Sequence, residues 1–192
     1  MIRLFVAFFV FCLSVQLKAS CPKPPVPEIV DSIQAVFKPS AAADSSTETP
    51  FFHYLDVEYM TKAVVGRFHW NQASPQDIEK LFALYKTMIN KQYRKFLLSQ
   101  AHKRPLLDIN PKLVQDDGER FSLTGYIKRP KRARAPVTFF FHCHNAQTWK
   151  LYDIAFDNLY LLEQIKLQFA TVIRHGGIPA LIKELNKLND QN

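Results

Sequence analysis

The sequence contains little of what usually marks an enzyme or an integral membrane protein. It has five glycines and three cysteines in 192 residues. The patterns Gly-x-Ser-x-Gly, His-Glu-x-x-His and Cys-x-x-Cys are missing, and so are glycine-rich phosphate loops. Beyond the N-terminal segment, no apolar run is long enough to span a bilayer. These absences exclude the common hydrolase, metalloprotease and nucleotide-binding motifs, and we expect no enzymatic activity.

The N-terminal residues have the parts of a secretory signal. Arg3 precedes the apolar run Leu4–Leu13, and small residues follow a short polar stretch. Leu17 and Ala19 occupy the two positions that a signal peptidase reads. We therefore predict a cleaved signal peptide over residues 1–19 and export of the remaining chain.

Two cysteines remain after that cleavage, and each has more than one interpretation. Cys21 could be acylated in a lipoprotein, but Lys18 stands where such a signal places a branched apolar residue. In an oxidising compartment Cys21 and Cys143 could form a disulfide. A buried thiol at Cys143 beside a free or modified Cys21 is the other alternative, and the sequence leaves the choice open.

Residues 20–192 have the length of a single domain with its own core, and they are basic. Without Arg3 and Lys18 the chain keeps 23 Lys and Arg residues against 17 Asp and Glu residues, a net charge of +6. A basic balance suits nucleic acid, an anionic membrane surface or an acidic protein. Because an exported protein rarely meets nucleic acid, we expect no nucleic-acid partner.

The positive charge is concentrated between two predicted strands, in residues 128–134. Such a basic hairpin tip either keeps a loop soluble or docks on an anionic headgroup or an acidic partner. Its basic residues are Lys128, Arg129, Lys131, Arg132 and Arg134.

Helices come first along the chain, strands next and helices last. Ser74, Pro75 and Asp77 form a capping box that opens a long helix. Gly176-Gly177 ends one C-terminal helix before a proline begins another. The predicted helices cover residues 29–37, 51–65, 75–99, 162–173 and 179 onward, and an exposed loop covers residues 38–50.

The middle block alternates apolar and polar residues between short turn signals. Asp117-Gly118 marks one turn, and Pro111 indicates that the first strand lies at an edge or contains a bulge. Four strands are predicted, over residues 106–115, 121–128, 136–144 and 149–157. The fold class is therefore α+β, with a four-stranded antiparallel sheet packed against several helices.

Two groups of polar residues are candidates for reactive sites. His142 and His144 stand two apart on a predicted strand, so their side chains point to the same face and supply two ligands for a metal. Because the nearby sequence has no cluster of acidic residues or histidines to complete the shell, we expect solvated histidines and no metal. Asp153 and Asp157 form a candidate carboxylate pair, but strand-end carboxylates are more often solvated or capping groups.

Four stretches, taken together, resemble one protein family. Two lie in the first half, residues 59–68 followed by Trp70, and residues 73–77. The second half contributes residues 149–154, Gln168-Phe169, Gly176-Gly177 and Leu181-Ile182. Their order and spacing over residues 50–190 resemble the MlaC/toluene-tolerance family of periplasmic phospholipid-binding proteins.

The resemblance implies an α+β domain related in part to the nuclear-transport-factor-like (NTF2-like) fold, with an apolar lipid pocket between sheet and helices. It implies no cofactor, only a bound phospholipid. Such periplasmic proteins shuttle lipid between an outer-membrane lipoprotein complex and an inner-membrane ABC transporter with an MCE-domain subunit, which maintains outer-membrane lipid asymmetry. Since a shuttle must leave each partner, we expect a monomer. The chain departs from the family pattern at Tyr160 and at Ile165-Lys166.

The long helix, the third strand and the first C-terminal helix present wide apolar faces. Most of this surface is expected to be ordinary core, but an excess of apolar faces is also how a protein lines a lipid cavity. Each buried CH₂ of an acyl chain contributes about 0.8 kcal/mol, so two long chains bind through apolar walls alone. The predicted wall residues are Phe82, Tyr85, Leu123, Phe139, Phe141, Tyr152, Ile154 and Ile165.

Two rival hypotheses come from other classes of protein. One is an exported interaction protein that uses the basic tip at residues 128–134 and binds no ligand. The other is an envelope enzyme on the same scaffold, with Asp153 or His142 in a polar cavity.

Overall fold

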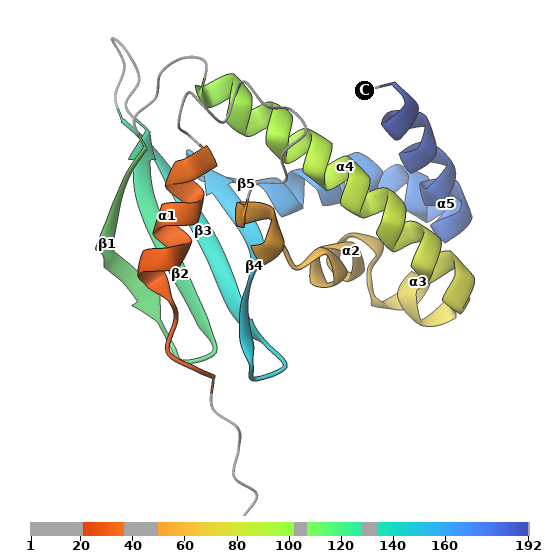
Figure 1. Cartoon of the computed structure of the whole chain (residues 1–192). Helices are drawn as coiled ribbons and strands as arrows, with labels where there is room; N and C mark the ends of the chain where they lie inside the picture. Colours follow the sequence, from red (N-terminus) through yellow and green to blue (C-terminus); the bar gives the residue numbers. More distant parts are fainter. Residues whose placement is uncertain (1–20, 37–49, 102–106, 128–133, 192) are drawn as a thin grey trace, which may run out of the picture.

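The structure is a computed structural model, and helices gather on one side of an antiparallel sheet (Figure 1). It describes residues 21–36, 50–101, 107–127 and 134–191. The predicted signal peptide, nearly all of the predicted loop and most of the basic tip lie outside these residues. Within them, no helix combines the length and the apolar character needed to cross a membrane.

The first helix packs through a narrow apolar stripe. α1 (Val26–Val36) follows the proline-rich entry and begins three residues before the predicted start at residue 29. Its buried residues recur at helical spacing and are Ile29, Val30, Ile33 and Val36.

The prediction of one helix over residues 51–65 was wrong, because the structure has two helices there with a break at Leu55–Asp56. A short 3₁₀ helix, η2 (Pro50–Tyr54), precedes α2 (Val57–Val65). Leu55 forms a parallel bridge with Leu151, and the Asp56 N–H donates to the Leu151 carbonyl at 2.8 Å. Because this backbone pairs with a strand, it cannot also continue a helix.

The predicted helix start is confirmed at α4 (Pro75–Ala101), where the Ser74 side chain makes one of the two bonds of a capping box. The Ser74 hydroxyl accepts the N–H of Asp77 at 3.1 Å and donates to the Asp77 carboxylate at 2.8 Å. A short helix, α3 (Arg67–Gln72), fills the space between Gly66, the predicted stop of α2, and this cap.

The sheet is an antiparallel meander of five strands, so the predicted number of four was wrong. The strands follow chain order as β1 (Leu107–Asp116), β2 (Arg120–Ile127), β3 (Ala135–His144), β4 (Thr148–Phe156) and β5 (Leu159–Tyr160). Asp157 and Asn158 both have positive φ, which gives a tight turn between β4 and β5. Because β5 has two residues, it shows no alternation that a sequence pattern could reveal.

The two faces of the sheet differ in composition. The face that we call inner carries Leu123, Phe139, Phe141 and Ile154, which are all buried. The outer face carries Thr138, Phe140, His142 and His144 of β3, which are half-buried. Of three successive phenylalanines on β3, the structure buries Phe139 and Phe141 of the inner face completely and Phe140 of the outer face only in part.

Helices α1 and η2 cover the inner face (Figure 1). The Phe51 ring of η2 lies 6.0 Å from the Phe139 ring, and the Tyr54 ring lies 6.3 Å from that of Phe141. β1 is the edge strand, with an irregular register between Ile109 and Val114 that confirms the expectation from the proline there.

The last element, α5 (Leu161–Asp190), confirms the predicted break in the C-terminal helix. Gly177 interrupts the helix with φ 60° and ψ −152°, a conformation that a residue with a side chain adopts only under strain. α5 begins beside β4 and β5 and continues against α2 and α4 (Figure 1).

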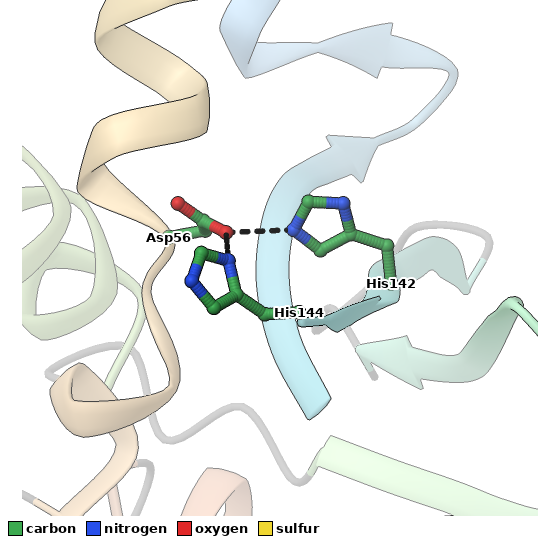
Figure 2. Close-up of side chains that lie close together, drawn as sticks. All are labelled: Asp56, His142 and His144. Carbon is green, nitrogen blue, oxygen red and sulfur yellow. Dashed lines mark hydrogen bonds and ion pairs between the residues drawn. The ribbon is translucent and has the colours of Figure 1, made fainter. Parts of the chain in front are cut away.

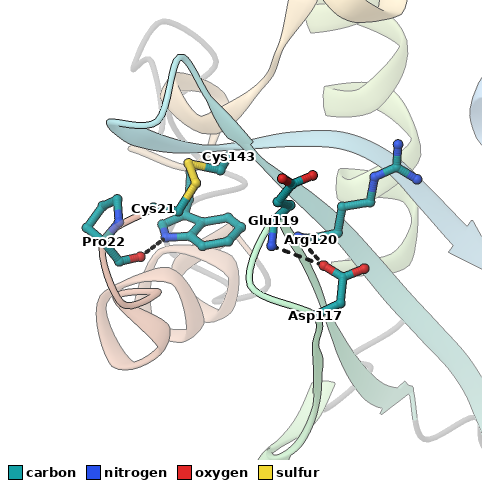
Figure 3. The surroundings of a disulfide bond; sticks show 7 residues. Cys21, Pro22, Asp117, Glu119, Arg120 and Cys143 are labelled. Atoms are coloured by element: carbon teal, nitrogen blue, oxygen red, sulfur yellow. Dashed lines mark hydrogen bonds between the residues drawn. A yellow bond between two sulfur atoms is a disulfide. The ribbon is translucent and has the colours of Figure 1, made fainter. Parts of the chain in front are cut away.

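A disulfide joins the start of the described chain to the end of β3 (Figure 3). The Cα atoms of Cys21 and Cys143 are 6.1 Å apart, and the cysteines are separated by 122 positions in sequence. Next to it, the Trp149 indole N–H donates to the Pro22 carbonyl at 2.8 Å. The Asp117 carboxylate closes the neighbouring turn by accepting the N–H groups of Glu119 and Arg120 (Figure 3).

Removing this disulfide should lower the free energy of unfolding by about 2–5 kcal/mol, because the bond closes a long loop and so restricts the unfolded chain. The variant is Cys21→Ser/Cys143→Ser, and the measurement is urea denaturation. Reductant should bring the wild-type protein to the same stability and leave the variant unchanged. Equal stability of the oxidised wild type and the variant would contradict the expectation.

Candidate functional site

The structure places six of the eight predicted wall residues in one buried apolar cluster. They come from α4, β2, β3, β4 and α5, so the cluster joins the inner face of the sheet to the helices. The six are Tyr85, Leu123, Phe139, Phe141, Ile154 and Ile165. We call this cluster the apolar interior.

The two remaining predicted wall residues lie outside the apolar interior. Phe82 is half-buried, and its ring packs 5.5 Å from that of Trp70. Tyr152 lies on the outer face, where its ring is 5.2 Å from His142. The cause is a bulge in β4: Phe140 pairs with Asp153 but Phe141 pairs with Leu151, so Tyr152 is an extra residue. Strict alternation, which the prediction assumed, does not hold at a bulge.

One polar atom in the apolar interior is unpaired among the described residues. The Tyr85 hydroxyl is buried and has no hydrogen-bond partner there. Burial, together with the nearby charge of Asp153, holds the pKa of Tyr85 well above its usual value, so the phenol stays neutral. A buried hydroxyl without a partner costs about 1–3 kcal/mol, which a polar group of a ligand could recover.

Asp153, one of the two residues named by the enzyme hypothesis, has a structural role. Asp153 Oδ1 accepts the N–H of Ile154 at 2.8 Å and that of Leu162, in the first turn of α5, at 3.0 Å. Asp153 therefore caps α5 from within β4. Burial raises the pKa of its carboxyl group despite these two hydrogen bonds. Asp157, its predicted partner, lies in the exposed turn before β5.

A second cluster of polar side chains lies on the outer face (Figure 2). Asp56 Oδ2 contacts His142 Nε2 at 2.7 Å and His144 Nδ1 at 3.0 Å. Asp56 Oδ1 accepts the Tyr59 N–H at 2.8 Å, which caps α2. Burial acts to raise the pKa of Asp56, but the His142 hydrogen bond, the Tyr59 amide and the charge of both histidines outweigh it and lower the pKa.

Sequence reasoning found the two histidines and missed their partner. Asp56 is 86 positions from His142, so no local spacing connects them. Asp56 stands immediately before the first residue of α2, where an Asp is typical of an N-cap. This pattern predicts its role at the helix start but not its contact with β3.

Of the predicted basic tip, the described residues include Arg134, which is exposed just before β3. The other four basic residues of the tip lie outside the described residues, and its docking role stays a prediction.

Comparison with known proteins identifies similar sequences and structures. A family model described as MlaC protein matches residues 29–187. A solved phospholipid-binding protein from Ralstonia solanacearum, in complex with a phospholipid, has a similar fold with a TM-score of 0.65. The two chains are 23% identical over 86% of this chain and 95% of the other. A search of the curated proteins found no match.

Asp153→Asn should keep the cap of α5, because one amide oxygen can accept both N–H groups that Oδ1 now accepts. Asp153→Ala should lower the free energy of unfolding by about 1–3 kcal/mol, because it leaves two N–H groups unpaired. Urea denaturation of both variants at neutral pH measures the difference. If Asn and Ala destabilise equally, the charge and not the acceptor holds α5.

The same variant has an expected pH dependence. Since the folded-state pKa of Asp153 is raised, the folded protein binds the proton more tightly, and this group's contribution to stability falls as pH rises from its ordinary pKa through the raised one. The Asp153→Asn variant has no carboxyl group at this position and so lacks this pH-dependent contribution to stability. The stability of Asp153→Asn relative to wild type should therefore increase over this interval and then level off.

Proposed function

Because the chain belongs to the MlaC family, as the match over residues 29–187 shows, we propose that it binds a phospholipid in its apolar interior and carries it through the periplasm. The family match is the observation that carries this proposal. The solved protein of similar fold from Ralstonia solanacearum is a phospholipid-binding protein in complex with a phospholipid.

The apolar interior has the composition that acyl chains need. Its side chains are aromatic and aliphatic, from Leu123, Phe139 and Ile154 of the sheet to Ile165 of α5. Binding follows from the transfer of acyl CH₂ groups out of water, at about 0.8 kcal/mol each. The Tyr85 hydroxyl supplies one donor for a polar group of the lipid.

The buried polar groups favour a carrier over an enzyme. Among the described residues, the buried polar or charged side chains besides that of Tyr85 are those of Asp56, Thr61 and Asp153. Each bonds to the backbone of a helix or of a helix start: Asp56 to Tyr59, Thr61 to Val57 at 2.6 Å and Asp153 to Leu162. These contacts stabilise helices, and none of them pairs an acid with a base inside the apolar interior.

The proposal includes a route. The chain is exported by a signal peptide at residues 1–19 and works as a monomer. It passes lipid between an outer-membrane lipoprotein complex and an inner-membrane ABC transporter with an MCE-domain subunit, and so maintains the lipid asymmetry of the outer membrane. The basic residues 128–134 are the docking segment for an anionic headgroup or an acidic partner.

Native mass spectrometry of residues 20–192, purified without detergent, tests the ligand directly. We expect a stoichiometric mass excess over the polypeptide, and solvent extraction should release a two-chain phospholipid. A bare polypeptide mass that stays unchanged after incubation with phospholipid vesicles would contradict the carrier proposal and favour the hypothesis of an exported interaction protein.

A matched pair of substitutions on α5 tests the site. Ile165 is buried in the apolar interior, whereas Leu167, two residues further along the same helix, is 68% exposed. Placing an amide in an apolar site costs about 1–3 kcal/mol, so Ile165→Asn should reduce lipid retention about tenfold or more. Leu167→Asn should retain lipid like the wild type.

Circular dichroism establishes that both α5 variants are folded before lipid is counted. Equal lipid content in two folded variants would contradict the assignment of Ile165 to the lipid site.

A further inference from the structure

We propose that Asp56, His142 and His144 form a binding site for a divalent transition-metal cation, with zinc the best match, on the outer face of the sheet. Two imidazole nitrogens and one carboxylate oxygen are ligands that Zn²⁺ takes, with a fourth position left for water. The three ligand atoms lie within 4.8 Å of one another. The site is separate from the apolar interior, and it reverses our expectation from the sequence that these histidines bind no metal.

The backbone brings the three donors together. His142 and His144 stand two apart on β3, so both rings project from the same face. Asp56 is held against β4 by the hydrogen bond from its N–H to the Leu151 carbonyl. In Figure 2 both rings point at the same carboxylate oxygen, Oδ2.

Neighbouring groups hold the ligands in place before an ion arrives. The Tyr59 amide occupies Asp56 Oδ1, which leaves Oδ2 turned toward the histidines. The Tyr59 ring lies 4.8 Å from the His142 ring, and the Tyr152 ring lies 5.2 Å from it. The bulge in β4 is therefore what places Tyr152 beside the proposed site. Hydrogen bonds to a ligating carboxylate, such as that of the Tyr59 amide, fix ligand orientation in metal sites.

The two nitrogen–oxygen distances are close to those that an ion needs, and the two ring nitrogens lie within 4.8 Å of each other. Around a tetrahedral Zn²⁺ with bonds of about 2.0–2.1 Å, neighbouring ligand atoms lie about 3.3 Å apart. The two N···O distances of 2.7 and 3.0 Å need to open by a few tenths of an ångström. Because a carboxylate oxygen can only accept, each of these ring nitrogens now donates its N–H to Asp56 Oδ2. On binding, each ring moves that proton to its other nitrogen or releases it to water, and the freed lone pair binds the ion.

The ion can enter from solvent. The His144 side chain is 35% exposed and that of His142 is 17% exposed, whereas the Asp56 side chain is 4% exposed. Two positively charged side chains repel the metal ion and limit its affinity. They are Arg120 and Lys150, which stand opposite His142 on the two neighbouring strands. The Lys150 ammonium group is directed to the His53 carbonyl at 2.9 Å. We therefore expect micromolar rather than nanomolar binding.

An occupied site would link the helices to the sheet. Asp56 begins α2, which packs against α4 and α5, and the histidines belong to β3. An ion that binds only the folded chain raises its stability. At a free zinc concentration a hundredfold above the dissociation constant, the midpoint of thermal unfolding should rise by about 5–10 °C.

The test uses untagged residues 20–192 with the disulfide intact, so that neither a tag nor the paired cysteines bind the metal. Calorimetric titration with zinc chloride should give one ion per chain. Cobalt chloride should produce the visible absorption of a four-coordinate site. His144→Ala should weaken zinc binding at least tenfold, and His142→Gln should do the same.

His175→Ala is the matched control, since His175 is an exposed histidine of α5, an element that does not contribute to the cluster. It should bind zinc like the wild type. If the wild-type protein gives no heat of zinc binding and no rise in its unfolding midpoint, the proposal is overturned. Equal binding by His144→Ala would overturn it too, and would mean that these residues form only a hydrogen-bonded cluster tying α2 to β3.

Discussion

The contact between the segment Leu55–Asp56 and the middle of β4 determines how the helices meet the sheet. Leu55 bridges to Leu151, and the Asp56 N–H donates to the same residue's carbonyl. This pairing ends η2, lets Asp56 cap α2 and directs α2 toward α4 and α5. A buried backbone donor and acceptor must find partners, and β4 provides them at a position that β5, with two residues, does not cover.

The sheet separates two chemical environments that the proposals assign to different ligands. Its inner face joins α1, η2 and the start of α5 in the apolar interior, where the proposed lipid would transfer its acyl chains out of water. Its outer face carries half-buried rings and the cluster of Asp56 with His142 and His144. A phospholipid and a metal cation would thus bind on opposite sides of β3 without sharing a residue.

The two acidic residues at the ends of helices show why a buried carboxylate need not be catalytic. Asp56 begins α2 and is also bonded to two histidines, so its pKa is lowered despite burial. Asp153 caps α5 with backbone contacts alone, and burial raises its pKa. The difference arises from the partners, because a histidine can compensate the carboxylate charge and an amide does so only in part.

Local features could be predicted from the sequence because a few neighbouring residues determine them. The Ser74–Asp77 cap, the break at Gly177 and the alternation along β2 and β3 depend on contacts within a turn or a strand, and the order of these elements predicts the α+β class. The family resemblance likewise rests on short stretches in a given order, and the match over residues 29–187 confirms it.

Other features were decided only by the tertiary structure. The bulge at Tyr152, the break in the helix at Leu55–Asp56, and the meeting of Asp56 with two histidines 86 and 88 positions away all arise where distant segments compete for the same hydrogen-bonding groups. Such competition leaves no periodic trace in the chain, because its outcome depends on which backbone groups the packed sheet leaves unpaired.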